Sequence, residues 1–210
     1  MMPKGSEGLT HARKEEIVRA CASLYETMSF KDITIKEIGA VTSFTRTSIY
    51  NYFQTKEEIF LALFQREYEE WTAELDRVAA ENEALTGDGL ARALARSLEK
   101  RGMLLKLLSM NLYDMEENSR MERLVSFKTA YGDSILAVTR LLEKFCPRMD
   151  EAERQRFIFA FFPFIYGVYP YTAVTDKQRE AMEAAGVRPA HLSVYEMVYS
   201  CAQKLLAGVS

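Results

Sequence analysis

Residues 34–58, TIKEIGAVTSFTRTSIYNYFQTKEE, contain two short predicted helices and the start of a third. Thr34 and Glu37 have the spacing of a capping box, in which the hydroxyl accepts an unpaired backbone N–H and the carboxylate reaches back. The apolar residues that follow recur at helical spacing, which predicts about two turns of helix: Ile35, Ile38 and Val41.

A second short helix is predicted after the break at residues 43–44. Thr45 can cap this helix, and Ile49 is then turned towards a core. Thr55 and Glu58 repeat the capping-box spacing, which predicts that a third helix begins there. The stretch therefore reads as helix, turn, helix and the beginning of a longer helix.

Two short helices joined by a tight turn can place the second helix in the major groove of DNA. Arginine pairs bidentately with guanine, while Thr, Ser and Asn side chains bond base edges or phosphates. The side chains expected to face bases are those of Arg46, Thr47, Ser48 and Asn51. Those expected to hold phosphates and so fix the register are Thr34, Thr45, Tyr50, Tyr52 and Lys56.

This stretch resembles the TetR family of bacterial transcriptional regulators. That family's pattern is a Thr-started helix, a turn, a short helix ending in Tyr-x-Tyr-Phe, and then x-Ser/Thr-Lys-Glu-Glu. The matching residues are Thr34, Ile38, Thr45, Ile49, Tyr50, Tyr52, Phe53, Lys56, Glu57 and Glu58. One residue departs from the pattern, because the family usually has Gly in the turn where this chain has Ser43. A Ser there must avoid or tolerate a positive φ, so the conformation of the turn is the open question.

Charge favours the alternative that the motif belongs to a helical protein-interaction module without sequence-specific DNA binding. Residues 1–60 contain eight Lys and Arg against eight Asp and Glu, and the whole chain has a net charge of −3. DNA-binding domains are usually basic, because phosphate neutralisation supplies much of their affinity. The order and spacing of the motif outweigh this count, so DNA binding is the preferred hypothesis.

The remaining sequence predicts an all-α protein without a long strand pattern or an internal repeat. Helices are expected over residues 10–29, from 55 to about 80, and in further segments up to 206, with a loop at 111–118. A capping box is also expected at Ser119 and Glu122. The predicted domains are a three-helix DNA-binding unit at 1–54 and a larger helical domain at 55–210, which the long helix from Thr55 links.

Residues 157–174, FIFAFFPFIYGVYPYTAV, carry no charge and could by length alone be a membrane span. Pro163, Gly167 and Pro170 interrupt the segment, and its apolar residues are mainly aromatic. We therefore expect a buried helix that is apolar all round and kinked at Pro163, and no membrane association.

Composition argues against an enzyme or a metal protein. The 210 residues are 48% hydrophobic and 27% charged, which is ordinary for a globular protein. No phosphate-binding Gly-rich loop, nucleophile elbow or His-bearing metal motif is present, so no cofactor is expected. Cys21, Cys146 and Cys201 are widely spaced, which predicts reduced, buried thiols. The N-terminus lacks the apolar core of a signal peptide, so a cytoplasmic protein is expected.

The family resemblance implies a small-molecule pocket in the larger domain and a homodimer built on the last two long helices. Adaptable and aromatic side chains there suggest a hydrophobic or aromatic effector, although such residues are more often plain core. The predicted lining residues are Met103, Met110, Tyr113, Phe127, Tyr131, Phe161, Phe164, Tyr166 and Tyr169. The expected function is a ligand-responsive repressor that binds a near-palindromic operator as a two-fold symmetric dimer.

Overall fold

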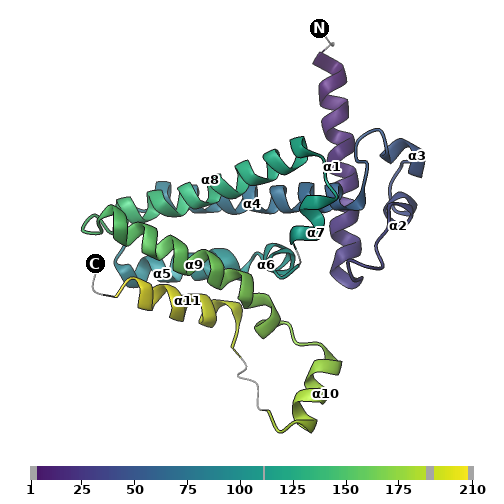
Figure 1. The fold of residues 1–210 in the computed structure, drawn as a ribbon. Helices are drawn as coiled ribbons and strands as arrows, with labels where there is room; N and C mark the ends of the chain where they lie inside the picture. Colours follow the sequence, from purple (N-terminus) through teal and green to yellow (C-terminus); the bar gives the residue numbers. More distant parts are fainter. Residues whose placement is uncertain (1–3, 111, 188–191, 208–210) are drawn as a thin grey trace. The chain divides into compact units, whose positions relative to one another are not determined.

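The computed structural model describes residues 4–110, 112–187 and 192–207, and the regular secondary structure of these residues is entirely helical (Figure 1). The predicted all-α class is therefore confirmed. The helices are α1 (Lys4–Thr27), α2 (Ile35–Ala40), α3 (Arg46–Ile49), α4 (Lys56–Glu81), α5 (Gly87–Glu99), α6 (Gly102–Leu108), α7 (Leu112–Glu117), α8 (Met121–Phe145), α9 (Glu151–Thr172), α10 (Asp176–Ala184) and α11 (Val194–Leu205).

The chain forms two compact units, each built from two separate stretches of sequence. The first unit consists of residues 1–67 and 111–131, and the second consists of residues 68–110 and 132–210. Helices α4 and α8 each begin in the first unit and end in the second. The first unit thus contains the helix-turn-helix stretch together with α7 and the start of α8.

The core of the first unit joins α1 to the predicted DNA-reading helices. Ile17 and Cys21 of α1 are 0% exposed, as are Ile38 of α2 and Ile49 of α3. The ring of Phe60 closes this core, with its centroid 5.1 Å from Tyr25 and 4.8 Å from Phe30, both edge to face. Burial raises the pKa of the Cys21 thiol to about 12, so this cysteine stays protonated. Helix α1 therefore covers the apolar side of α2 and α3.

In the second unit α11 packs against α5 and α9, and α6 packs against α9 and α5. An apolar stripe on α4 is buried in this unit, since Tyr68, Trp71 and Leu75 are at most 1% exposed. The indole of Trp71 lies 5.9 Å from the ring of Phe162, and its Nε1 donates to Oγ of Ser97 at 3.0 Å. The stripe of one helix thus contributes to the cores of both units.

Three local predictions for the chain are wrong. Helix α1 begins at Lys4 rather than Thr10. The prediction missed its first turns because their sequence has no apolar periodicity. The predicted loop at 111–118 contains α7, which is anchored by Met115 at 0% exposure. Ser119 does not form the expected capping box, since its hydroxyl donates to the carbonyl of Met115 at 2.7 Å.

The uncharged segment at 157–174 forms most of α9, but this chain buries only one of its faces. The inward side chains are Phe157, Ile158, Phe161, Phe162, Ile165 and Val168. Outward-facing Phe159 is 75% exposed and Tyr171 is 71% exposed, so the predicted burial holds for only one face of this helix within a single chain. Over the described residues no single helix has the length and apolar composition to cross a bilayer, whereas α9 and α10, bent by 82°, pass that test only as a pair.

The bond between Trp71 and Ser97 gives a stability test for the second unit. Ser97→Ala leaves the buried indole N–H without its acceptor, so we expect the free energy of unfolding to fall by about 1–3 kcal/mol. Fluorescence of Trp71, the only tryptophan, in a urea titration measures this. Ser109→Ala is the control. The exposed Ser109 hydroxyl donates to the carbonyl of Lys106, three residues back, as the Ser97 hydroxyl donates to the carbonyl of Leu94. Equal effects of the two changes would contradict this role for Ser97.

Candidate nucleic-acid interface

Two threonine caps set the starts of α2 and α3. The hydroxyl of Thr34 accepts from the backbone N–H of Lys36 at 3.2 Å and of Glu37 at 3.4 Å, and it also donates to the Glu37 carboxylate. Thr45 accepts from the N–H of Ser48 at 3.3 Å. Both caps were predicted, and both are confirmed.

The turn between α2 and α3 accommodates Ser43 without strain. Among the described residues other than glycine none has a positive φ, so Ser43 keeps an ordinary backbone conformation. Its N–H donates to Oε1 of Glu16 on α1 at 2.8 Å, and this bond lowers the pKa of the Glu16 carboxyl. The hydroxyl of Thr42 accepts from the N–H of Phe44 at 3.4 Å. A carboxylate from a neighbouring helix therefore holds the turn.

The residues predicted to face bases lie on the outer surface of α3 and just beyond it. Arg46, Thr47 and Asn51 are exposed. Nη2 of Arg46 donates to the hydroxyl of Tyr50 at 3.2 Å, and the guanidinium stands 5.8 Å from that ring. Ser48 shares a 3.0 Å hydrogen bond with the Thr45 hydroxyl. Within the described residues the side chains of Thr47 and Asn51 make no hydrogen bond, which leaves their polar groups available to a ligand.

Three residues predicted to hold phosphates, Thr34, Tyr50 and Lys56, border one surface hollow, and Arg46, predicted to face bases, borders it too. Lys56 also has a structural role, because its ammonium donates to the carbonyls of Phe30 at 2.7 Å and Ile33 at 3.1 Å. An ammonium has three donors, so one remains for a phosphate.

Tyr52 is tied to α1, because its hydroxyl accepts from Nη1 of Arg13 at 3.0 Å. Sequence reasoning missed Arg13 and Glu16 of α1, and also Arg120 and Arg123 at the start of α8. Burial and then the positive charges of Arg123 and Arg120 lower the pKa of Lys14, so cations from distant parts of the chain gather here. A charge count restricted to residues 1–60 omits two of these cations, Arg120 and Arg123.

The residues predicted to line a ligand pocket divide between the two units. Tyr113, Phe127 and Tyr131 belong to the first unit, and the second contains Met103, Met110, Phe161, Phe164, Tyr166 and Tyr169. Phe127 and Phe161 are at most 1% exposed, whereas the ring of Tyr113 is 83% exposed and faces solvent. Burial raises the pKa of Tyr169.

The capped helix-turn-helix of the first unit and the helical second unit define a helix-turn-helix protein with an all-helical C-terminal domain. A family profile described as tetracyclin repressor-like, C-terminal domain, matches residues 65–210. This chain therefore belongs to the TetR family of transcriptional regulators. The uncharacterized HTH-type transcriptional regulator YfiR of Bacillus subtilis (strain 168) is 28% identical over 79 residues, which span 38% of each chain.

Solved structures of low sequence identity share the fold. A TetR-family transcriptional regulator from Mesorhizobium loti MAFF303099 has a TM-score of 0.63 at 16% identity, covering 94% of this chain and 96% of that one. The fatty acid degradation regulator FadR from Bacillus halodurans has a TM-score of 0.58 at 17% identity, covering 93% of this chain and 95% of that one. The MbdR regulator from Azoarcus sp. CIB has a TM-score of 0.53 at 17% identity, covering 93% of this chain and 98% of that one.

The bond from Ser43 to Glu16 predicts a pH dependence. Because the pKa of Glu16 is lowered, the bond is fully present above the usual Glu value of about 4.3 and is lost as pH falls through the lowered pKa. We expect the NMR shift of the Ser43 amide proton to titrate with a midpoint below that value. Glu16→Gln should abolish this titration, and the control Glu15→Gln should leave it intact. A Ser43 titration that persists in Glu16→Gln would contradict the assignment.

Proposed function

We propose that this TetR-family regulator is a repressor that binds a near-palindromic operator as a homodimer and is released by a small hydrophobic or aromatic effector. In this proposal residues 1–54 read DNA, and residues 55–210 bind the effector and form the dimer. Its role is not catalytic, and its place is in the cytoplasm with the operator. Effector binding would favour a dimer whose two recognition helices no longer match successive major grooves.

The observation that carries the proposal is the outer surface of α3. A helix capped by Thr45 and anchored by the buried Ile49 presents the exposed side chains of Arg46, Thr47 and Asn51. A short helix of this kind with polar groups at its outer surface suits recognition of base edges. Thr34, Tyr50, Tyr52 and Lys56 would hold the flanking phosphates, with Ser48 beside the bases.

The effector site is proposed in the aromatic interior of the larger domain. Buried or half-buried side chains of α6 and α9 supply adaptable apolar surface there, and α6 packs against α9. Met103, Phe161, Phe164, Tyr166 and Tyr169 are the candidates on these helices, with Met110 of the same unit. Tyr113 is the one predicted member whose exposure argues against inclusion.

The proposed dimer surface is the outward face of α9 together with α11. TetR-family regulators act as DNA-binding dimers. Phe159 and Tyr171 lie exposed on α9, where the chain has no charge from 157 to 174, and α11 packs beside this helix. Exposed apolar patches of this kind mark interaction surfaces, and a second copy would cover them symmetrically.

Phe159→Asp tests the dimer. A carboxylate buried without a partner is costly, so the dissociation constant of the dimer should rise by about 100-fold or more. Sedimentation equilibrium at micromolar concentration gives the measurement, and operator affinity should fall with it. Tyr113→Asp, another exposed aromatic position, is the control and should remain dimeric. A Phe159→Asp protein that dimerises like the original would show that α9 is not the interface.

Selection from a library of random DNA duplexes tests the function directly. Enrichment of a two-fold symmetric site at moderate salt supports the regulator and supplies the operator. Binding without enrichment that disappears as salt rises would instead favour the interaction-module alternative, because such binding reads only phosphate charge.

Arg46→Ala tests the reading of bases. We expect binding to the selected operator to weaken by about 1–3 kcal/mol, roughly 5- to 150-fold, while affinity for a random duplex is retained. Fluorescence anisotropy with both duplexes measures the two affinities. Arg77→Ala, which removes an exposed arginine from the second unit, controls for charge. Unchanged operator affinity in Arg46→Ala would refute the role.

A further inference from the structure

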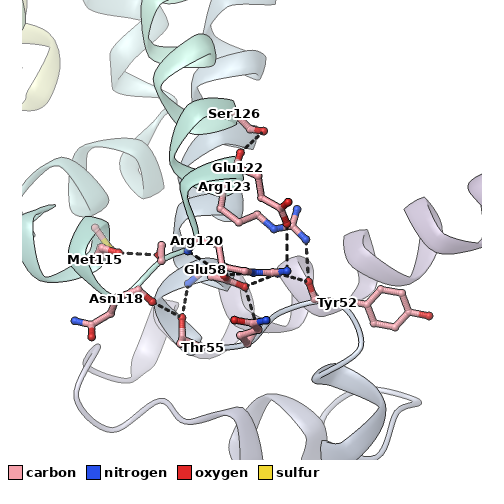
Figure 2. A network of polar contacts seen from close by, with 11 residues as sticks. Tyr52, Thr55, Glu58, Met115, Asn118, Arg120, Glu122, Arg123 and Ser126 are labelled. Atoms are coloured by element: carbon pink, nitrogen blue, oxygen red, sulfur yellow. Dashed lines mark hydrogen bonds and ion pairs between the residues drawn. The ribbon is translucent and has the colours of Figure 1, made fainter.

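The carboxylate of Glu58 in the first turn of α4 is buried and fully paired (Figure 2). This side chain is 0% exposed. Its Oε1 accepts from Nε of Arg120 at 2.6 Å and from the Arg120 backbone N–H at 3.1 Å. Its Oε2 accepts from Nη2 of Arg120 at 2.9 Å and from the N–H of Gln54 at 2.8 Å. Burial acts to raise the pKa of Glu58, but the hydrogen bonds from Arg120 and Gln54 outweigh burial and lower it.

The carbonyl oxygen of Tyr52, three residues beyond the end of α3, lies beside this ion pair. It accepts from Nη2 of Arg123 at 2.8 Å and from Nη2 of Arg120 at 3.4 Å (Figure 2). The N–H of Tyr52 donates to the carbonyl of Ile49 at 2.8 Å, and the guanidinium of Arg123 stands 5.0 Å from the ring of Phe53. The Tyr52 N–H thus satisfies the last carbonyl of α3, which has no donor within the helix. The carbonyl of the same residue is held by the two arginines.

These arginines come from outside the predicted DNA-binding residues. Arg120 directly precedes α8 and Arg123 lies in its first turn, while α8 continues to Phe145 in the second unit. A further bond comes from the same region, since the hydroxyl of Thr55 donates to the carbonyl of Asn118 at 3.0 Å. The end of α3 is therefore held by the start of a helix that belongs mainly to the second unit.

We infer that Arg120 and Arg123 are positioning residues for DNA reading, which fix the orientation of α3 through the Tyr52 carbonyl and the Glu58 carboxylate. The inference rests on the proposed function. Contacts with bases depend on the orientation of the recognition helix, whereas phosphate attraction tolerates a change in tilt. Loss of the arginine contacts should therefore weaken specific binding and leave nonspecific binding nearly unchanged. A role in folding alone would not separate the two affinities.

Arg120→Lys is the sharpest test because it keeps the charge of the full-length protein. A lysine ammonium is a compact point charge without the planar fork of the guanidinium, so it cannot reproduce the two-point pairing with Glu58 together with the contact to the Tyr52 carbonyl. We expect affinity for the selected operator to fall by about tenfold or more, with affinity for a random duplex within about twofold of the original. Arg123→Met should show the same separation, and Arg123→Lys should recover most of the loss, since lysine can still donate to the carbonyl.

Arg140→Met is the matched control. Arg140 is another α8 arginine, half exposed, whose Nη2 pairs with Oδ1 of Asp76 at 2.6 Å within the second unit. Its replacement should change neither affinity. Circular dichroism in urea identifies any variant that does not fold, and Arg120→Lys carries the test if Arg123→Met is such a variant.

Equal losses on operator and random duplex, or no loss for Arg120→Lys and Arg123→Met, would overturn the positioning role. If the original protein enriches an operator but the variants give either of these results, the proposed function stands and the positioning role fails. If the original protein enriches no sequence, both are refuted.

Discussion

One apolar stripe along α4 is the constraint on which both units depend. Phe60 and Phe64 are 0% exposed in the first unit, and Tyr68, Trp71 and Leu75 are at most 1% exposed in the second. These positions repeat every three or four residues, so they lie on one side of a continuous helix. A change of packing in either core acts on the same helix.

The DNA-reading helices depend on their surroundings for stability. Helices α2 and α3 have six and four residues, far fewer than an isolated helix needs to persist in water. The Thr34 and Thr45 caps satisfy free N–H groups at their starts, while the buried Ile38 and Ile49 attach them to α1. The polar contacts of Tyr52 then hold the end of α3. Every terminus of this motif therefore has a partner, which explains how so short a helix can present side chains in a defined direction.

Local patterns predicted the features that depend on neighbouring residues. The caps at Thr34 and Thr45 formed as predicted, because each hydroxyl and its N–H target lie two or three residues apart. At Thr55 only half of the predicted capping box formed. The hydroxyl accepts from the N–H of Glu58 at 3.2 Å, but the Glu58 carboxylate pairs with Arg120, which lies 62 residues away. No local pattern contains that information.

The other errors in prediction also arose where a structure depends on residues that are distant in the sequence. Helix α7 has several acidic residues and one buried side chain, that of Met115. Its sequence therefore resembles that of a loop, because the burial of Met115 depends on the folded chain. The order of motif residues was enough to predict a DNA-reading surface, because that order is local. The contributions of Glu16 and Arg123 required the folded chain, since they reach the motif from other helices.

The free polar groups of Thr47 and Asn51 bear on how such a protein can evolve. Neither side chain bonds to another described residue, so substitutions at these two positions change the presented surface without removing an internal contact. Arg46 and Ser48 differ, because each also bonds to a neighbour on or beside α3. Divergence of a duplicated copy towards a new target sequence is thus least constrained at two adjacent surface positions, while the scaffold that aims them is kept.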